Sequence, residues 1–351
     1  MSSGPLTRVL SLAWREGPEA IDISAEELTE VSPLLLGSGT GALVWHRIRN
    51  SNLRSSPVAF QFQQAYRQHT LEAARHERDI VSIVAAMRSR GIDPILIKGW
   101  SIARLYPEKG MRPYDDTDLV VRCNQYSSAL AVTENQSVTE FSVDLHEGLE
   151  EFGYHGEEDF FANSQLVKLG EVDVRVPAPE DSLRVISLHL LQHGAFRPLW
   201  LCDVALAVES RTPAFDWDRC LGRNKRVADW VACTIGLAHQ LLGARIDDTP
   251  VKHRADNLPS WLIPTVLKQW EKPFAKDHGV ARHRAPMASY LRNPSGFLRD
   301  LRTRWPNPIE ATVYVGGPFN EFPRLPFQIG DCVARTAKFV ARLPKAFREA
   351  R

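Results

Sequence analysis

Cysteine is scarce in this sequence, and the few cysteines lack the spacing of a metal or redox motif. Five cysteines in 351 residues form an odd set without a Cys-x-x-Cys pair, which argues against both a disulfide-stapled scaffold and a zinc site. Such a set indicates a reducing compartment. The first residues lack the basic patch and apolar run of a signal peptide, and no apolar run approaches the roughly 20 residues of a membrane span. We therefore expect a cytoplasmic protein without a membrane segment.

A strong charge of either sign is also missing. The 43 basic and 42 acidic residues give a formal net charge of +1, which argues against a protein that coats nucleic acids. The sequence has no Walker loop, no Gly-x-Gly-x-x-Gly motif, no Ser-His-Asp nucleophile elbow and no apparent internal repeat. Its hydrophobic content of 44% is ordinary for a globular protein. A chain of this length can bury a sizeable core, in two domains or in one domain with extensions.

Residues 93–122 carry the strongest local pattern in the chain. The apolar run Ile95–Ile97 ends at Lys98-Gly99, which predicts a short buried strand stopped by a glycine. A helical pattern then begins at Trp100 and continues until Pro107 breaks it. A second strand is expected after a loop, with the sequence Asp116-Thr117-Asp118-Leu119-Val120-Val121.

Two aspartates occupy alternate positions of this second strand. Side chains repeat with a period of two along a strand, so Asp116 and Asp118 project from the same face. Carboxylates this close repel each other unless a cation lies between them, and hard oxygen ligands suit Mg²⁺. The alternative is that both are solvent-facing acids of a turn before the strand. The motifs around the aspartates favour the metal site.

An ordered series of motifs surrounds the aspartates. In chain order it comprises Lys98-Gly99, Leu105–Pro107, Arg112, Asp116–Val121, Val143–His146, Pro179–Leu183, Leu188–Gly194 and Leu201–Ala205. Over roughly residues 60–245, this series resembles the bacterial family described as uncharacterised nucleotidyltransferases, within the nucleotidyltransferase superfamily. The resemblance implies an α/β (α+β) protein. Its small mixed sheet, of the DNA polymerase beta type, would be flanked by N-terminal helices and followed by a helical domain.

The same resemblance implies a reaction. A nucleoside monophosphate would pass from a nucleoside triphosphate (NTP), with ATP as the expected donor, to an acceptor, and pyrophosphate would be released. Asp116, Asp118 and Asp144 would hold two Mg²⁺ ions, with Asp144 nearest the acceptor. The acceptor can be a small molecule, a protein or an RNA, and the sequence does not distinguish them.

Five further residues are candidates for binding the nucleotide, namely Lys98, Gly99, Ser101, Arg112 and His193. Gly99 lets the backbone turn tightly and approach a phosphate closely. Ser101 could offer a hydroxyl to the triphosphate, although Trp100 stands where the superfamily usually has a small residue. Arg112 suits a phosphate ligand and a salt-bridge anchor equally well.

The third carboxylate has two candidates. Alternating apolar residues predict a strand over 137–146, and Asp144 lies in its second half within the family-like tripeptide Asp-Leu-His. The rival is Asp173, in the strand-like segment Glu171–Val176. We prefer Asp144, because Asp173 occupies the position of the strand that precedes a helix in the family.

Two histidines are spaced four residues apart on a helix expected from Pro179 onwards. His189 and His193 have metal-ligand spacing, but no third ligand follows at a recognisable distance, which argues against zinc. The remaining interpretations are packed, hydrogen-bonded side chains or side chains that line the cleft beside Arg197 and Asp203.

The rest of the chain reads mainly as helix. Patterns predict helical segments within residues 6–54, a long helix over 60–90, and others over 125–133, 200–208, 227–243 and 333–347. Ser24 and Glu27 have the spacing of a capping box. Prolines divide the chain beyond Arg245 into short pieces. We expect an N-terminal helical segment (1–57), a catalytic core (58–178), a helical bundle (179–265) and an extension rich in Pro and Arg (266–351).

A function of another class stays open. A catalytically silent protein that binds a nucleotide or a partner, as a biosynthetic accessory or an antitoxin-like protein, would suit Trp100 and the short segment 122–143. The three acids count against it. The basic segment 333–347 offers a possible contact for a protein partner, although a solvated basic helix explains it equally.

Overall fold

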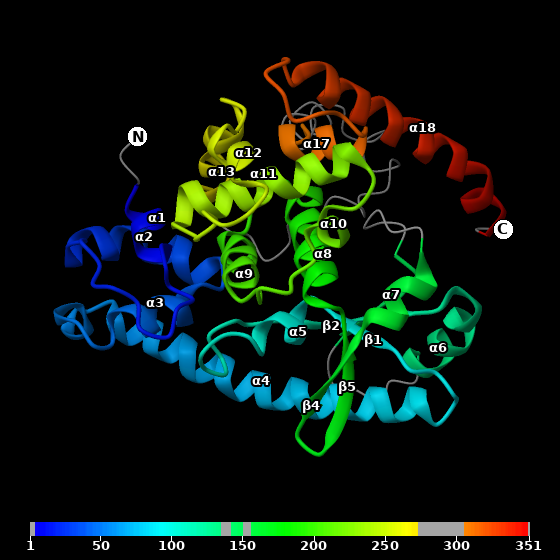
Figure 1. Cartoon of the computed structure of the whole chain (residues 1–351), viewed down its shortest axis with the longest axis horizontal. Helices are drawn as coiled ribbons and strands as arrows, with labels where there is room; N and C mark the ends of the chain where they lie inside the picture. The colour runs from blue at the N-terminus through cyan, green and yellow to red at the C-terminus, as the bar shows by residue number, and fades with distance from the viewer. Residues whose placement is uncertain (1–3, 135–141, 150–155, 273–304, 350–351) are drawn as a thin grey trace.

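The computed structural model describes residues 4–134, 142–149, 156–272 and 305–349, with the backbone alone for 339–349. Its sheet has five strands in the order β3-β2-β1-β5-β4 (Figure 1). The strands are β1 (Ile95–Ile97), β2 (Asp116–Val121), β3 (Ser142–Glu147), β4 (Gln165–Leu169) and β5 (Val172–Val176). β1 pairs antiparallel with β2 and parallel with β5, whereas β2 is parallel to β3. The predicted α/β fold with a small mixed sheet is therefore confirmed.

Alternate residues of the central strands enter two different cores. On one face, Leu96 and Leu119 pack in the same cluster as residues of α4 (Ala59–Arg88). On the other face, Ile97 and Val120 join the core of the helical bundle. The period of two along a strand produces this division. The sheet is thus a middle layer between one long helix and a bundle (Figure 1).

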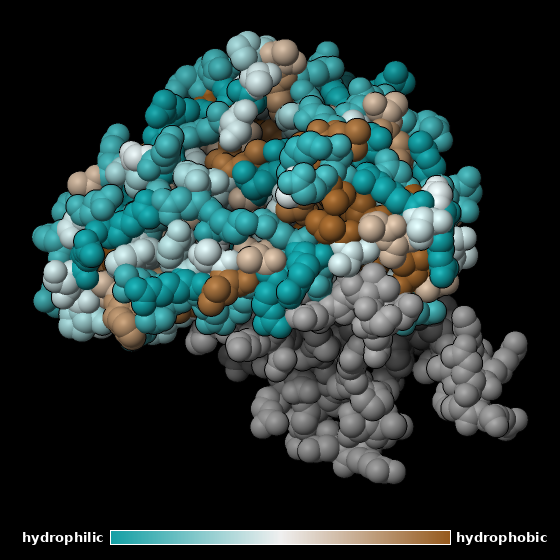
Figure 2. All heavy atoms as spheres, turned by 90° about the horizontal axis from the view of Figure 1, so that it is seen from below, coloured by the Kyte–Doolittle hydropathy of each residue, from teal (hydrophilic) through white to brown (hydrophobic). Residues whose placement is uncertain are grey.

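The long helix predicted over 60–90 is α4, whose 30 residues run along the base of the molecule in Figure 1. Its Ile80, Ile83 and Met87 are buried beneath the sheet. The molecule seen from below is mostly hydrophilic, with one larger hydrophobic patch right of centre and smaller ones elsewhere (Figure 2). The helix is therefore amphipathic, with its apolar stripe turned to the core. The chain turns through a positive φ of 73° at Gly91 and enters β1.

The N-terminal segment folds into short helices beside α4. They are α1 (Pro5–Leu10), α2 (Ala25–Gly37), α3 (Gly41–Ile48) and the 3₁₀ turn η1 (Asn52–Ser55). Ser24 and Glu27 form the predicted capping box at the start of α2, since each side chain bonds the backbone N–H of the other.

Polar contacts tie the start of the chain to residues about 200 positions later. The hydroxyl of Ser11 donates to the carbonyl of Leu242 at 2.9 Å. The indole of Trp14 donates to Glu209 at 3.0 Å, and the guanidinium of Arg15 forms an ion pair with the same carboxylate. The first helices are therefore part of the bundle's core and not a separate appendage.

The second half of the chain is a bundle of helices. In chain order they are α8 (Pro179–Gln192), α9 (Pro198–Glu209), α10 (Trp217–Leu221), α11 (Lys225–Leu242), α12 (Lys252–Asp256), α13 (Leu262–Trp270), α17 (Pro308–Tyr314) and α18 (Leu325–Glu349). The indole of Trp270 and the amide of Asn307 donate to the carbonyls of Ala195 and Gly194, at 3.0 and 2.9 Å. Residues beyond the predicted bundle thus pack on the turn between α8 and α9.

Shorter helices connect the strands. They are α5 (Gly99–Ala103), the 3₁₀ turn η2 (Cys123–Gln125), α6 (Tyr126–Thr133) and α7 (Glu157–Asn163). The helix after β1 is shorter than predicted, although hydrogen-bonded turns continue to Tyr106. β4 and α7 were not predicted. Residues 137–141, the first part of the predicted third strand, lie outside the described ranges.

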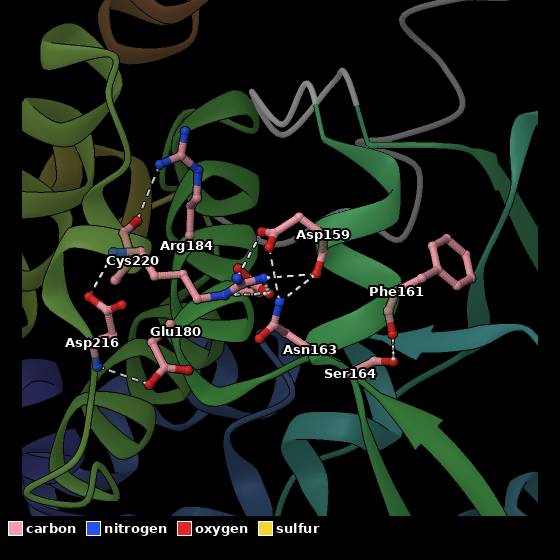
Figure 3. Close-up of polar contacts among 10 residues, drawn as sticks. Asp159, Phe161, Asn163, Ser164, Glu180, Arg184, Asp216 and Cys220 are labelled. Carbon is pink, nitrogen blue, oxygen red and sulfur yellow. Dashed lines mark hydrogen bonds and ion pairs between the residues drawn. The ribbon is translucent and has the colours of Figure 1, made fainter.

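A polar network joins α7 to the bundle (Figure 3). The guanidinium of Arg219 in α10 contacts the buried carboxylate of Asp181 in α8 at 2.5 Å and that of Asp159 in α7 at 2.8 Å. Glu180 accepts from the backbone N–H of Asp216, the residue that caps α10. These contacts hold α7, the helix between β3 and β4, against the bundle.

Within the described ranges, none of the helices is both long enough and apolar enough to cross a lipid bilayer. All five cysteines lie in these ranges and are free thiols.

A buried ion pair holds the loop before β2 against α9. The guanidinium of Arg112 reaches the carboxylate of Asp203 at 2.9 Å, and the two side chains are only 7% and 2% exposed. The hydroxyl of Tyr106 donates to the same carboxylate at 2.9 Å. Burial would lower the pKa of Arg112, but the charge of Asp203 outweighs this effect and raises it. Arg112 is therefore a buried cation held against the carboxylate of Asp203.

We predict that Asp203→Ala lowers the free energy of unfolding by about 3–5 kcal/mol, because it leaves the charge of Arg112 buried and unpaired. The measurement is urea unfolding followed by circular dichroism. The double variant Arg112→Met/Asp203→Leu should recover most of the loss. Asp173→Ala is the matched control, since it removes an exposed ion pair with Lys168 and should cost less than about 1 kcal/mol. Equal losses in both single variants would refute the anchoring role.

Candidate functional site

One cavity of about 340 Å³ lies between the sheet and the bundle. Its sheet wall comprises Lys98, Gly99, Asp116, Asp118, Asp144 and His146. The loop before β2 adds Arg112, Tyr114 and Asp115, and the helical wall comprises Ile186, His189, Gln192, His193, Arg197, Trp200 and Asp203. A wall rich in acids thus faces a wall rich in aromatic rings.

The strand register brings the three candidate carboxylates together. β2 and β3 run parallel, and Asp118 stands directly beside Asp144. Because side chains alternate, Asp116 lies on the same face of β2 as Asp118, and His146 on the same face of β3 as Asp144. Asp118 is 4% exposed, whereas the side chain of Asp144 is 58% exposed. The acids therefore extend from the floor of the pocket to its mouth.

The rival third carboxylate, Asp173, does not line this pocket. It lies on β5, which β1 separates from β2. Its carboxylate is 3.0 Å from the ammonium of Lys168 on the neighbouring strand β4. The geometry therefore supports Asp144 as the partner of the two aspartates on β2.

Lys98 directly follows β1, and its side chain reaches across to β2. Its ammonium nitrogen is 2.7 Å from Oδ1 of Asp118. The backbone of Lys98 has a φ of 49°, a conformation that costs a residue with a side chain of the order of 1–3 kcal/mol. Such strain persists only where the surrounding structure imposes it, and it is frequent at functional sites.

The two aspartates of β2 have opposite pKa shifts. Burial opposes ionisation of Asp118, but the hydrogen bond from His146 and the charge of Lys98 outweigh it and hold its pKa below the ordinary value. For Asp116, loss of hydration in the cleft and the nearby charge of Asp118 raise the pKa to about 6. Asp118 therefore loses its proton easily, whereas Asp116 holds its proton unusually strongly. Such a difference is expected where two carboxylates are close together.

The nucleotide-binding candidates from the sequence occupy different places. Gly99 lines the pocket with a φ of 29°, and a β-carbon there would lie 3.5 Å from the carbonyl of Asp116. Ser101 is buried and is not among the lining residues. Arg112 lines the pocket, but its guanidinium is bound to Asp203. His193 lies in the opposite wall.

The helical wall presents a group of aromatic rings. The ring centre of His189 is 4.5 Å from those of both His193 and Trp200, and His193 and Trp200 are 5.3 Å apart. Loss of hydration, followed by the charge of Lys98, holds the pKa of His189 well below its usual value. Its ring is therefore neutral at pH 7. Both histidines line the cleft, as one interpretation of their spacing suggested.

Some pocket residues had no role assigned from the sequence. His146 approaches Asp118 to 3.1 Å and Asp144 to 3.5 Å, and its position two residues after Asp144 on one strand is the signal that identifies it. Trp200 is brought to His189 by the packing of α9 on α8. Tyr114 is buried in the loop before β2. No local pattern in the sequence predicts that Trp200 contacts His189 or that Tyr114 is buried in the pocket wall.

More than half of the chain is similar to known proteins. The sequence model of a family described as uncharacterised nucleotidyltransferase matches residues 30–139 and 132–243. The crystal structure of an antigenic nucleotidyltransferase-like protein from Paracoccidioides brasiliensis is similar over 51% of this chain and 97% of that chain, with 14% identity and a TM-score of 0.35. The search among curated proteins found no match.

The raised pKa of Asp116 generates a prediction. A carboxyl with a higher pKa in the folded than in the unfolded state destabilises the fold as pH rises from about 4 to about 6, and the loss stays constant above. Asp116→Asn removes this loss. Because the carboxylate is partly open to solvent, we expect a gain on the order of 1 kcal/mol at pH 7 and almost none at pH 4.

The measurement is the melting temperature of both proteins at the two pH values, in the presence of a chelator. Asp173→Asn, outside the pocket, is the control and should show no comparable gain. An Asp116→Asn protein that is less stable than the wild type at pH 7 would contradict the prediction.

Proposed function

Because the chain belongs to the uncharacterised nucleotidyltransferase family, we propose that it transfers a nucleoside monophosphate from a nucleoside triphosphate to a hydroxyl group of an acceptor. The observation that carries the proposal is the convergence of Asp116, Asp118 and Asp144 on one wall of one pocket. ATP is the donor that we favour. The acceptor can be a small molecule, a protein or an RNA.

The acidic wall fits divalent metal ions. Carboxylate oxygens are the ligands that Mg²⁺ prefers, and Asp116 and Asp118 crowd negative charge that a cation relieves. Lys98 already places a positive charge against Asp118. When bound, two Mg²⁺ ions would neutralise phosphate charge and favour ionisation of the attacking hydroxyl. Asp116, Asp118 and Asp144 are the residues that would hold them.

The reaction itself needs one bond to form and one to break. The acceptor oxygen attacks the α-phosphorus, and the bond from that phosphorus to the oxygen bridging it to the β-phosphate breaks with its electron pair. Pyrophosphate leaves, and the hydroxyl proton passes to a base. Asp144 is the group that we assign as this base, because its side chain lines the pocket and is 58% exposed, which leaves it open to an incoming acceptor.

Other residues would orient the donor. Lys98 can form an ion pair with the phosphates through its ammonium group. The backbone at Gly99 leaves room for the phosphates to approach closely. Arg112, held by Asp203, would fix the loop that carries Asp115 and contribute positive charge to the pocket. Electrostatic positioning of this kind supplies most of the rate gain in phosphoryl and nucleotidyl transfer.

The aromatic wall suits the nucleobase. A flat ring can stack on Trp200, beside His193, while the triphosphate extends towards Lys98 and the aspartates. Stacking of a base on an aromatic side chain contributes about 1–3 kcal/mol. The pocket thus divides into a polar half for phosphates and an aromatic half for a base.

We predict that the protein binds an NTP with Mg²⁺ only when the three acids are intact. Isothermal titration should give micromolar affinity for at least one NTP, with Mg²⁺ required. Asp118→Asn and Asp144→Asn should each weaken binding at least about tenfold, since they remove metal ligands. Asp173→Asn is the matched control and should bind as the wild type does.

Two outcomes would decide against parts of the proposal. Loss of binding in Asp173→Asn with normal binding in Asp144→Asn would overturn the assignment of the third carboxylate. If an NTP binds in a metal-dependent way but no pyrophosphate is released with any acceptor tested, a catalytically silent nucleotide-binding protein is favoured.

A second prediction concerns the aromatic wall. Trp200→Ala should weaken nucleotide binding about tenfold through lost stacking, while the affinity for divalent metal alone stays unchanged. The test compares calorimetric titrations with NTP–Mg²⁺ and with the metal alone. Unchanged nucleotide affinity would exclude Trp200 from the base site.

A further inference from the structure

The acidic wall of the pocket also carries an imidazole. Asp118, Asp144 and His146 each offer one ligand atom, and these atoms all lie within 4.8 Å of one another. Nε2 of His146 is 3.1 Å from Oδ1 of Asp118 and 3.5 Å from Oδ2 of Asp144. All three are therefore close enough to bind a single ion after small side-chain rotations.

The sheet holds these side chains in place. Asp118 and Asp144 are neighbours in the parallel register of β2 and β3, and His146 follows Asp144 on the same face of β3. Asp118 is 4% exposed, and the side chain of His146 is 12% exposed. The side chain of Asp144 is 58% exposed and leaves the cluster open to an incoming ion, so two ligands are largely buried and one faces solvent. A site on strands is also more rigid than one on loops.

The donor set differs from that of a pure magnesium site. Mg²⁺ is a hard ion that takes oxygen ligands, whereas imidazole nitrogen suits zinc, cobalt and other first-row transition metals. Three protein ligands from His and carboxylates, with a position left open, are typical of zinc ions that act in catalysis. Asp116 lies outside this group, so its carboxylate oxygens are available to a second, harder ion.

We propose that Asp118, Asp144 and His146 form a carboxylate–imidazole site that binds a divalent transition-metal ion, such as Zn²⁺ or Co²⁺, more tightly than Mg²⁺. The proposal rests on the metal site of the proposed function, but it does not need the transfer reaction to occur. It makes His146 a metal ligand, whereas a site built from the three carboxylates alone would not use His146.

Lys98 already marks the site as one that attracts a cation. Its ammonium lies 2.7 Å from Oδ1 of Asp118, the oxygen that also contacts His146. An incoming ion must displace this ammonium, which then becomes available to a phosphate. Exchange of the ammonium for a metal ion would thus couple loading of the site to binding of the donor.

The test is a titration of the full chain, freed of metal by a chelator, with Co²⁺. Visible absorption of bound Co²⁺ reports nitrogen ligation and geometry directly, without any nucleotide. We expect one equivalent of Co²⁺ to bind, to be displaced by equimolar Zn²⁺, and to resist a large excess of Mg²⁺. His146→Asn should weaken Co²⁺ binding at least about tenfold and change the spectrum.

His193→Asn is the matched control, since it removes an imidazole from the same pocket but not from the cluster. It should bind Co²⁺ as the wild type does. His146→Gln, checked by circular dichroism, replaces His146→Asn if the latter does not fold.

The outcomes separate this proposal from the proposed function. Co²⁺ binding that is equal in wild type and His146 variants, or that Mg²⁺ abolishes at similar concentration, overturns the mixed site and leaves the transfer reaction standing. Co²⁺ binding that depends on His146 in a protein that binds no NTP supports the mixed site and removes the nucleotide from its function.

Discussion

The buried contact between Arg112 and Asp203 determines how the two halves of the molecule meet. Arg112 precedes β2 by a few residues, and Asp203 lies in the middle of α9. A charge pair sealed from water cannot slide or exchange partners without a large cost, so it fixes the loop before β2 against the bundle. The aspartates of β2 consequently face the aromatic residues of α8 and α9 across a narrow space. Arg112 and Asp203 both line the pocket, so this ion pair joins the loop before β2 directly to the helical wall.

Within the sheet, the parallel pairing of β2 with β3 has a similar importance. A shift by one residue would turn Asp144 and His146 to the other face, towards α4 and away from the pocket. The buried Leu119 and Val120 determine which face of β2 turns to α4 and which turns to the bundle, because they belong to different cores. Hydrophobic packing therefore decides the placement of polar groups that contribute nothing to the core.

The sequence predicted what depends on local signals. The apolar periodicity of α4 and the alternation that puts Asp116 and Asp118 on one face need only neighbouring residues, and both agree with the structure. β4 escaped prediction because its residues are mostly exposed and lack a clear alternation. The edge-to-face contact of Trp200 with His189 depends on how two helices pack after a turn, which no pattern within either helix specifies. The charged partner of Arg112 was open for the same reason, since Asp203 follows 91 residues later.

The contacts of Ser11 with Leu242 and of Trp14 with Glu209 have a consequence for biosynthesis. Sequence separations of 231 and 195 residues mean that Ser11 and Trp14 leave the ribosome before these two partners have been made. At about 5–20 residues per second, translation supplies those partners only about 10–45 s later. During that interval the contacts of Ser11 and Trp14 with the second half of the chain cannot form. The contact of Ser11 with Leu242 forms only after α11 has left the ribosome, so the N-terminal helices are joined to this part of the bundle late in synthesis.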